Sequence, residues 1–314
     1  MSVYIHGGLR SPIGVLNGQY KHMRPEILGS QVIDEIINRY SISHIDGIFC
    51  GNAIGTGGNL GRLMGLMCNL PNSVPAITVD MQCASALMSI EIAYAHIVSG
   101  IMDSAIAGGI ESSSLQPERV YAFGDDREGA YKVAQFTPQD QSPLAMLEGA
   151  ERTIHKHNVT KEDLYPHIIG SHQRASAALD NPYLQSYIMP ITIDGKRCID
   201  ECIRPTMNEK LLSRMKPLLG ADSITNAGNS CLTHDGAAFV YLSNEKGPFK
   251  IHNVMPWAGN PQFSPEGALE STEAILKRTG LTMDDIDVVE WNEAFAIIDV
   301  LFDKTYPNHI GKYN

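Results

Sequence analysis

The stretch VDMQCASALMSIEIA, from Val79 to Ala93, places one cysteine between two different sequence patterns. The run ITVD at 77–80 is rich in β-branched residues and predicts a short strand. The residues that follow the cysteine predict a buried helix from the apolar side chains Leu87, Ile90, Ile92, Tyr94 and Ile97. We therefore expect Cys83 at a strand-to-helix turn.

Cys83 has two interpretations. A helix start offers free backbone N–H groups and the positive end of the helix dipole, and both favour a thiolate. The small residues Ala84, Ser85 and Ala86 leave room above the sulfur. These features predict a reactive cysteine. The alternative is a buried structural cysteine, which is the commoner role for this residue type.

The composition is that of a globular protein with a large core. Of 314 residues, 43% are hydrophobic and 19% are charged, which allows two ordinary domains or one large one. The chain has no apolar run of about 18 residues, so we expect no membrane span. The N-terminus MSVYIHGGLRSP lacks signal-peptide anatomy. The formal net charge of −11 argues against a nucleic-acid partner.

The cysteines predict reduced thiols in the cytoplasm and no disulfide framework. They are Cys50, Cys68, Cys83, Cys198, Cys202 and Cys231. The segment CIDEC holds Cys198 and Cys202, but no second pair and no histidine cluster completes a zinc pattern. We therefore expect no metal site.

Strand and helix patterns alternate through the first part of the chain. Strands are predicted at 3–8, 44–52, 75–80 and 101–111, and helices at 27–40, 61–70 and 85–100. Such alternation is typical of a buried, largely parallel sheet that is covered on both faces. Gly108 and Gly109 predict close packing at a strand end, not phosphate binding.

The pattern changes between Ser112 and about Ser223. Pro, Gln, Arg and Tyr become frequent, helices such as the one at 162–180 are predicted, and strands are few. Strand patterns return at 223–231, 234–244 and 249–259. The middle of the chain is therefore expected to be an inserted, mostly helical loop region.

A repeat links the two ends of the chain. SISHIDGIFCGNA at 41–53 resembles LTMDDIDVVEWNEA at 281–294, and the helix at 27–40 has a counterpart at 268–280. Two matches in the same element order predict a duplicated fold in which short strands end at Asn52 and Asn292. We expect an N-terminal half at 1–115, the helical insert at 116–222 and a shorter second half at 223–314.

These segments also carry motifs of a known family. The chain resembles the thiolase family of acyl-CoA acetyltransferases, and NEAFA separates it from the related ketoacyl synthases. The matching segments are RSPIG at 10–14, GN at 51–52, QCASAL at 82–87, AGGIES at 107–112, SHQRA at 171–175, NAGNSCLTHDGAA at 226–238 and WNEAFA at 291–296. The resemblance implies duplicated α/β halves in a layered αβαβα arrangement, with a loop domain inserted in the first half.

The resemblance also assigns roles to individual residues. It implies that Cys83 is the nucleophile that takes the acyl group from CoA and that its N–H lines one oxyanion hole. It implies that Asn292 holds a water in another oxyanion hole, whereas a helix cap is the alternative for this asparagine. Met146 corresponds to the methionine of the acyl-binding loop. Cys231 stands where the family has a serine that contacts pantetheine.

The last residues depart from the family pattern. The resemblance implies a Gly-His-Pro motif and a Cys-x-Gly motif after NEAFA, whereas this sequence ends with YPNHIGKYN. We therefore expect a truncated second half and impaired thiolase activity, and we expect His309 to face solvent. A catalytically inactive thiolase-fold protein is the alternative, and a ketoacyl synthase relative is a weaker one.

The resemblance implies acyl-CoA as the partner molecule, with coenzyme A thioesters as substrates and no separate cofactor. It also implies a homodimer or homotetramer and a role in fatty acid metabolism. Acyl chain length and the choice between synthesis and degradation stay open.

Overall fold

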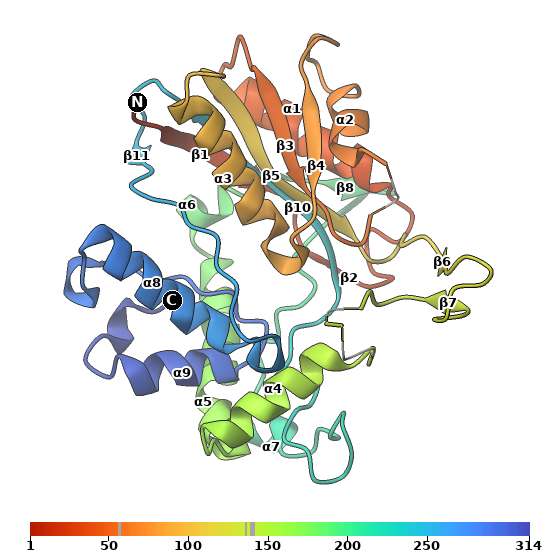
Figure 1. Cartoon of the computed structure of the whole chain (residues 1–314), viewed down its shortest axis with the longest axis vertical. Coiled ribbons are helices and arrows are strands. Elements are labelled where there is room, and N and C mark those ends of the chain that lie inside the picture. The colour runs from red at the N-terminus through yellow and green to blue at the C-terminus, as the bar shows by residue number, and fades with distance from the viewer. Residues whose placement is uncertain (56–57, 136, 139–141) are drawn as a thin grey trace. The chain divides into compact units, whose positions relative to one another are not determined.

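The computed structural model describes residues 1–55, 58–135, 137–138 and 142–314 (Figure 1). These residues form two compact units, each described here by itself. The first unit comprises Met1–Pro117, Ala178–Ile203 and Thr233–Val254. The second unit comprises Glu118–Ala177, Arg204–Leu232 and Met255–Asn314. The domain bounds expected from the sequence stay a prediction.

The first unit is built on a mixed sheet (Figure 1). Within the described residues its main path has the order β11-β1-β10-β5-β3-β4, and β2 pairs with β10. The strands are β1 Tyr4–Arg10, β2 Gly14–Val15, β3 Gly47–Gly51, β4 Ala76–Val79, β5 Ser104–Ser112, β10 His234–Ser243 and β11 Phe249–Lys250. The predicted strands at 3–8, 75–80 and 101–111 are confirmed at their centres by β1, β4 and β5.

The prediction of a largely parallel sheet is wrong. Strand β3 runs parallel to β4 and β5, but β10 pairs antiparallel with both β1 and β5. Because β10 comes from a distant part of the chain, the local strand–helix alternation gives no information about its direction. Strand β10 confirms the strand predicted at 234–244, and it lies in the middle of the sheet, between β1 and β5.

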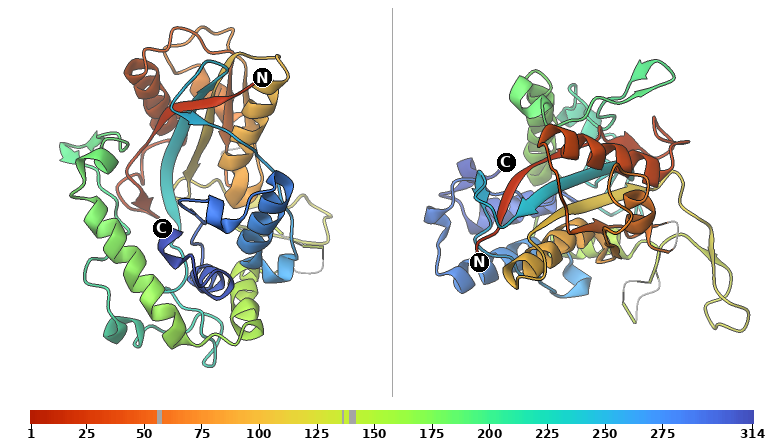
Figure 2. Two further views of the ribbon diagram at one scale, coloured as in Figure 1. Left: turned by 90° about the vertical axis from the view of Figure 1, so that its left-hand side faces the viewer. Right: turned by 90° about the horizontal axis from the view of Figure 1, so that it is seen from above.

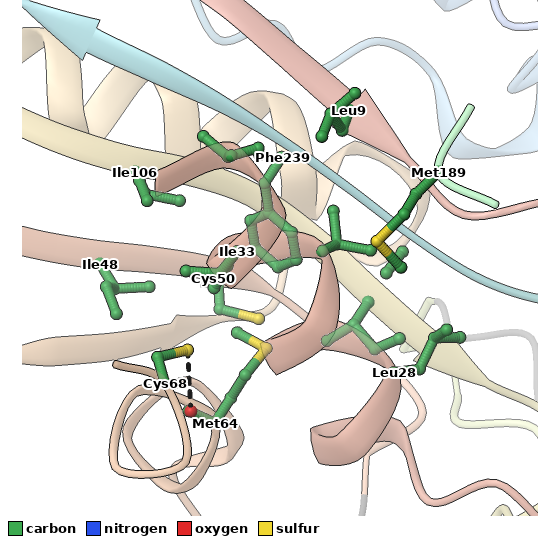
Figure 3. Close-up of a cluster of buried hydrophobic side chains, with 14 of the residues drawn as sticks. Leu9, Leu28, Ile33, Ile48, Cys50, Met64, Cys68, Ile106, Met189 and Phe239 are labelled. Carbon is green, nitrogen blue, oxygen red and sulfur yellow. Dashed lines mark hydrogen bonds between the residues drawn. The ribbon is translucent and has the colours of Figure 1, made fainter. Parts of the chain in front are cut away.

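Helices cover both faces of this sheet (Figure 2, right). The helices are α1 Pro25–Arg39, α2 Leu60–Gly65 and α3 Ser85–Val98. Ile48 and Cys50 of β3 belong to a core cluster with α1 and α2, whereas Phe49 belongs to a cluster with α3. This alternation of side chains along β3 is the two-residue period of a strand that is buried on both faces. Figure 3 shows the first cluster, with Ile33, Cys50 and Phe239 packed together.

Helix α3 is fully buried along one face only, whereas its apolar sequence predicted a buried helix. Its buried residues are Ser85, Ser89, Ala93 and Ile97, which are spaced four apart, whereas Leu87 is 71% exposed. Small side chains face the sheet because α3 lies very close to it, as described below. Of the large apolar side chains that predicted a buried helix, Ile97 is fully buried, whereas Ile90, Ile92 and Tyr94 are half-buried.

The second unit is mostly helical. Its main helices are α4 Ala145–Lys156, α5 Lys161–Ala178, α7 Glu209–Leu212, α8 Glu266–Thr279 and α9 Ile297–Thr305. Its hairpin is β6 Arg119–Val120 with β7 Ala130–Tyr131, while α6 Pro182–Gln185 and the hairpin of β8 Thr192–Ile193 with β9 Lys196–Arg197 belong to the first unit. Ile154, Leu164 and Leu301 lie in one buried cluster that joins α4, α5 and α9.

Two predicted strands do not form. The segment 223–231 makes isolated bridges, Pro217 with Asn226 and Ser230 with Phe295, and the segment 281–294 makes one bridge, Val289 with Tyr313. Helix α8 confirms the helix that the repeat predicted at 268–280. The strand that the repeat predicted at 281–294 is wrong for the described residues. A strand needs a neighbour over several residues, and here each contact is a single residue pair.

Two further properties concern only the described part of the chain. None of its helices is long and apolar enough to cross a membrane. None of its His, Cys, Asp and Glu side chains gather in a group of three or more that could hold a metal ion.

Candidate functional site

Cys83 lies in a short 3-10 turn, Gln82–Ala84, between β4 and α3. The residue before it, Gln82, has a φ of 51°, which is rare for a residue with a side chain. Ser85 stabilises this conformation, because its hydroxyl accepts a hydrogen bond from Met81 N at 2.8 Å and donates one to Gln82 O at 2.6 Å. Asp80 Oδ1 accepts a further bond from Gln82 N at 2.8 Å. The predicted strand-to-helix turn is confirmed.

The turn presents Cys83 outward. Cys83 is exposed, so the alternative of a buried structural cysteine is wrong. Among the described residues its backbone N–H has no hydrogen-bond partner. The residue lies two positions before the first residue of the 14-residue helix α3, near the positive end of the helix dipole. An exposed thiol and an unpaired N–H therefore lie at the same residue.

Glycines let the start of α3 approach the sheet. A Cβ on Gly51 would lie 2.4 Å from Ala86 N, and a Cβ on Gly109 would lie 3.0 Å from Ala86 Cβ. Ser89 fixes the contact, because its hydroxyl lies 2.8 Å from both the N and the O of Gly108. The predicted close packing at Gly108 and Gly109 is confirmed, but both residues lie in the middle of β5 and not at its end.

Glu111, at the end of β5, holds the GN segment. Its carboxylate accepts hydrogen bonds from Asn52 Nδ2 at 2.8 Å, Ala53 N at 2.9 Å and Ile54 N at 3.0 Å. The loop that follows β3 is therefore tied to the strand end of β5, next to Gly109. The motifs GN and AGGIES thus fix the strand ends against which α3 begins.

Asn292, in the second unit, is exposed and follows no strand. The N-cap of α9 is Ala296, and no side chain caps that helix, so the helix-cap alternative for Asn292 is wrong. The next residue, Glu293, is anchored by Ser171 Oγ at 2.6 Å and by Arg174 Nη2 at 3.2 Å. The motifs SHQRA and WNEAFA are therefore in direct contact.

Cys231 lies against the same segment. Its backbone N–H donates to Ala294 O at 2.8 Å, and Ala296 N–H donates to Asn229 O at 3.0 Å. Met146, on α4, is half-buried and packs against the cluster that contains Phe295. Met146, Cys231 and the segment of Asn292 are therefore gathered in the second unit, whereas Cys83 belongs to the first. The proximity of Cys83 to Asn292 stays a prediction.

A buried carboxyl lies beside Glu293. Asp299 on α9 is 3% exposed, and burial together with the negative charge of Glu293 raises its pKa to about 8. Burial and the nearby carboxylates also raise the pKa of the Tyr313 phenol. This end of the WNEAFA segment therefore carries a neutral acid at neutral pH.

The expectation that His309 faces solvent is wrong. Only 19% of its side chain is exposed, and its Nε2 lies 2.7 Å from Asp284 Oδ1. The ring also packs edge-on against Tyr306, with 6.5 Å between ring centroids. The fold turns His309 back onto the 3-10 helix Met283–Asp285.

Comparison with a family model identifies the chain. Residues 3–246 match the model of the thiolase N-terminal domain. The chain belongs to the thiolase family. The match includes Cys83 and Cys231, and it extends through β10.

Relatives and a solved structure agree with this thiolase assignment. The chain is 31% identical over 303 residues to a protein from Staphylococcus epidermidis named putative acetyl-CoA C-acetyltransferase VraB, covering 91% of this chain and 78% of that protein. It is 31% identical over 302 residues to the VraB protein of Staphylococcus aureus, covering 91% and 79%. The fold matches the crystal structure of the Bacillus anthracis acetyl-CoA acetyltransferase, with a TM-score of 0.88 at 24% identity, over all of this chain and 85% of that one.

Sequence reasoning missed several residues that shape these segments. Gln82 and Ser85 hold the turn of Cys83, and Glu293 anchors the segment of Asn292. For Ser85 the sequence does hold a signal, because a hydroxyl in the first turn of a helix commonly bonds the backbone.

Proposed function

We propose that this thiolase-family chain is an acyl-CoA C-acetyltransferase that uses Cys83 as its nucleophile. The observation that carries the proposal is the geometry of the Cys83 turn. An exposed thiol and an unpaired N–H stand together at a helix start, on a backbone that Ser85 holds in a rare conformation. Such strained, pre-organised turns are common at catalytic nucleophiles.

The first reaction step is transfer of an acyl group to the thiol. The Cys83 thiolate attacks the thioester carbonyl of acetyl-CoA, a carbon–sulfur bond forms to Cys83, and the bond to the CoA sulfur breaks. The CoA thiolate leaves and takes up a proton. We propose that the Cys83 N–H stabilises the negative charge that develops on the carbonyl oxygen.

We assign the other site residues to substrate. Asn292 holds a water that polarises a carbonyl, Cys231 contacts the pantetheine arm, and Met146 contacts the acyl group. Support comes from the contacts that bring Cys231 and the segment of Asn292 together. The substrate class of acetyl-CoA follows from the names of the relatives. A cytoplasmic location and a role in fatty acid metabolism go with this assignment.

The second step, condensation or thiolysis, needs a base for the α-proton of the acyl group. One general acid–base group is typically worth ~10²–10⁴-fold in rate. A protein that has the fold without acyl transfer is the second candidate.

Burst release of CoA tests the first step. Mixing the polypeptide with excess acetyl-CoA should release up to one CoA for each Cys83 in an initial burst, and Cys83→Ser should abolish that release. Cys202→Ser is the matched control, because it removes another thiol that has no role in the proposed site and should keep the release. Absence of release by the unsubstituted chain would support the second candidate, and equal release by Cys83→Ser would refute the nucleophile.

We also propose that two copies of the chain pair through the edge of the sheet at β4. Among the described residues β4 has a neighbour only on the side of β3. Ile77 on this strand is 45% exposed, and Leu63 and Leu87 nearby in the unit are 46% and 71% exposed. An open, apolar strand edge is a template for another strand, and a second copy offers the same edge by symmetry.

A further inference from the structure

Glu151 on α4 has no place in the proposed chemistry, yet one short segment supplies it with three hydrogen-bond donors. Its Oε1 accepts from Ile224 N at 2.8 Å, and its Oε2 accepts from Thr225 N at 2.8 Å and from the Thr225 hydroxyl. An exposed neighbour, His155, lies 3.0 Å from Oε1. Only 12% of the Glu151 side chain is exposed. The carboxylate therefore ties α4 to residues 224–225.

This carboxylate acts as an anion. Burial opposes its ionisation, but the bonds from Thr225 and Ile224 and the nearby His155 outweigh burial and hold the pKa of Glu151 below its ordinary value. Hydrogen bonds to a charged group are about twice as strong as bonds between neutral groups. Thr225, which is 1% exposed, is therefore held firmly.

The turn that follows is closed by two asparagine side chains. Asn226 N–H donates to Asn229 Oδ1 at 2.8 Å, and Gly228 N–H donates to Asn226 Oδ1 at 2.8 Å. Asn229 Nδ2 then donates to Ile224 O at 2.9 Å. The N–H of Ile224 bonds to Glu151, and the carbonyl oxygen of Ile224 bonds to Asn229. These two bonds attach the whole turn 224–229 to α4.

The far end of the turn joins the segment of Asn292. Asn229 O accepts from Ala296 N–H at 3.0 Å, Ser230 bridges to Phe295, and Cys231 N–H donates to Ala294 O at 2.8 Å. The contacts run without a break from Glu151 through the turn to residues 294–296. All of them lie within the second unit.

We propose that Glu151 is a positioning residue that sets the register of the turn 224–231 against the segment 292–296. It thereby fixes where Cys231 stands relative to Asn292. The effect on acyl-CoA rests on the proposed function, whereas the effect on register does not. Glu151 acts through the backbone of Ile224 and Thr225 and touches no substrate.

Hydrogen exchange of backbone amides, read by mass spectrometry on the full chain, tests the register. The variants are Glu151→Gln, which removes the charge, and Thr225→Val, which removes the hydroxyl. Losing the charged bonds should raise exchange roughly tenfold in peptides covering both 222–232 and 291–298. Thr225→Ser keeps a hydroxyl and should keep exchange slow. Glu162→Gln changes an exposed carboxylate on α5 and should leave both peptides unchanged. A peptide from α8 reports any general unfolding.

The outcomes separate cleanly. Faster exchange in both segments, with α8 unchanged, supports the proposal. Faster exchange confined to 222–232, or none at all, overturns it. If Glu151→Gln also raises exchange in the α8 peptide, Thr225→Val decides the test by its exchange in 222–232 and 291–298.

A second measurement connects the register to substrate. Glu151→Gln should raise the acetyl-CoA concentration that gives half-maximal CoA release, and it should leave the maximal release by Cys83 intact. A lower maximum with an unchanged concentration dependence would contradict the role in substrate positioning. If the unsubstituted chain releases no CoA, the proposed function fails, while hydrogen exchange still decides the register.

Discussion

At the scale of single residues, the turn of Cys83 shows how backbone conformation is fixed by a neighbour. Gln82 adopts a φ of 51°, and a residue with a side chain in this region costs of order 1–3 kcal/mol. The hydroxyl of Ser85 offsets this cost by bonding both Met81 N and Gln82 O. Sequence reasoning located Cys83 at a turn, but the positive φ depends on these bonds and not on the residue type of Gln82.

Asp299 gives a pH prediction at the same scale. Its pKa of about 8 lies above the ordinary value, so the folded chain holds a proton that the unfolded chain releases. The free energy of unfolding should therefore fall as pH rises from about 4 to about 8, by at most ~1.4 kcal/mol per pH unit, and level off above that. Glu293, Tyr313 and Arg174 are the titratable groups around this carboxyl.

Asp299→Asn keeps a neutral side chain that does not ionise. Its advantage over the unsubstituted chain should grow with pH between about 4 and about 8, as measured by urea unfolding at a series of pH values. Asp287→Asn changes an exposed carboxylate in the second unit, so it is the control and should leave the slope unchanged. Parallel pH curves for Asp299→Asn and the unsubstituted chain would show that Asp299 is ionised throughout.

At the scale of elements, the contact between α3 and the sheet depends on glycine. Gly51→Ala should destabilise the fold by about 1–3 kcal/mol, because its Cβ would lie 2.4 Å from Ala86 N and push the start of α3 away. Urea unfolding measures the loss, and the alkylation rate of Cys83 should change with it. Gly267→Ala on α8 meets nothing within 4 Å, so it should not lower stability. Equal stability of both variants would show that α3 does not need this close approach.

The elements also show what the sequence could and could not predict. Helices α1, α3, α5 and α8 follow from their apolar periodicity, and β5 follows from an unbroken run of small and branched residues. The direction of β10 and the single bridges of Ser230 and Val289 depend on partners far along the chain. The packing of α3 through Ser85 and Ser89 was also missed, because hydrophobicity ranks these residues as surface.

The candidate site was predictable to the same degree. Cys83, Asn292, Met146 and Cys231 came from motifs, and the structure gathers the last three in one unit. The support by Glu151, Ser171 and Glu293 was not predicted. Each of these polar side chains contacts a segment more than 70 residues away, which no local pattern reveals.

At the scale of the whole molecule, the open edge at β4 predicts self-association. Light scattering at micromolar concentration should show a dimer or a larger even assembly. Ile77→Lys places a charge on the paired edge and should shift the chain toward monomer. Ile310→Lys changes a side chain that is 48% exposed in the second unit and should leave the mass unchanged. A monomer before any substitution would refute pairing through β4.

The central claim is that Cys83 takes the acyl group, and peptide mapping after exposure to acetyl-CoA tests it most directly. The chain is mixed with acetyl-CoA, quenched in acid to preserve thioesters, digested and analysed by mass spectrometry. We predict one acetyl group on the peptide that contains Cys83 and none on the peptide that contains Cys231. Hydroxylamine should remove this acetyl group. Acetylation of Cys231 instead of Cys83, or of neither, would contradict it.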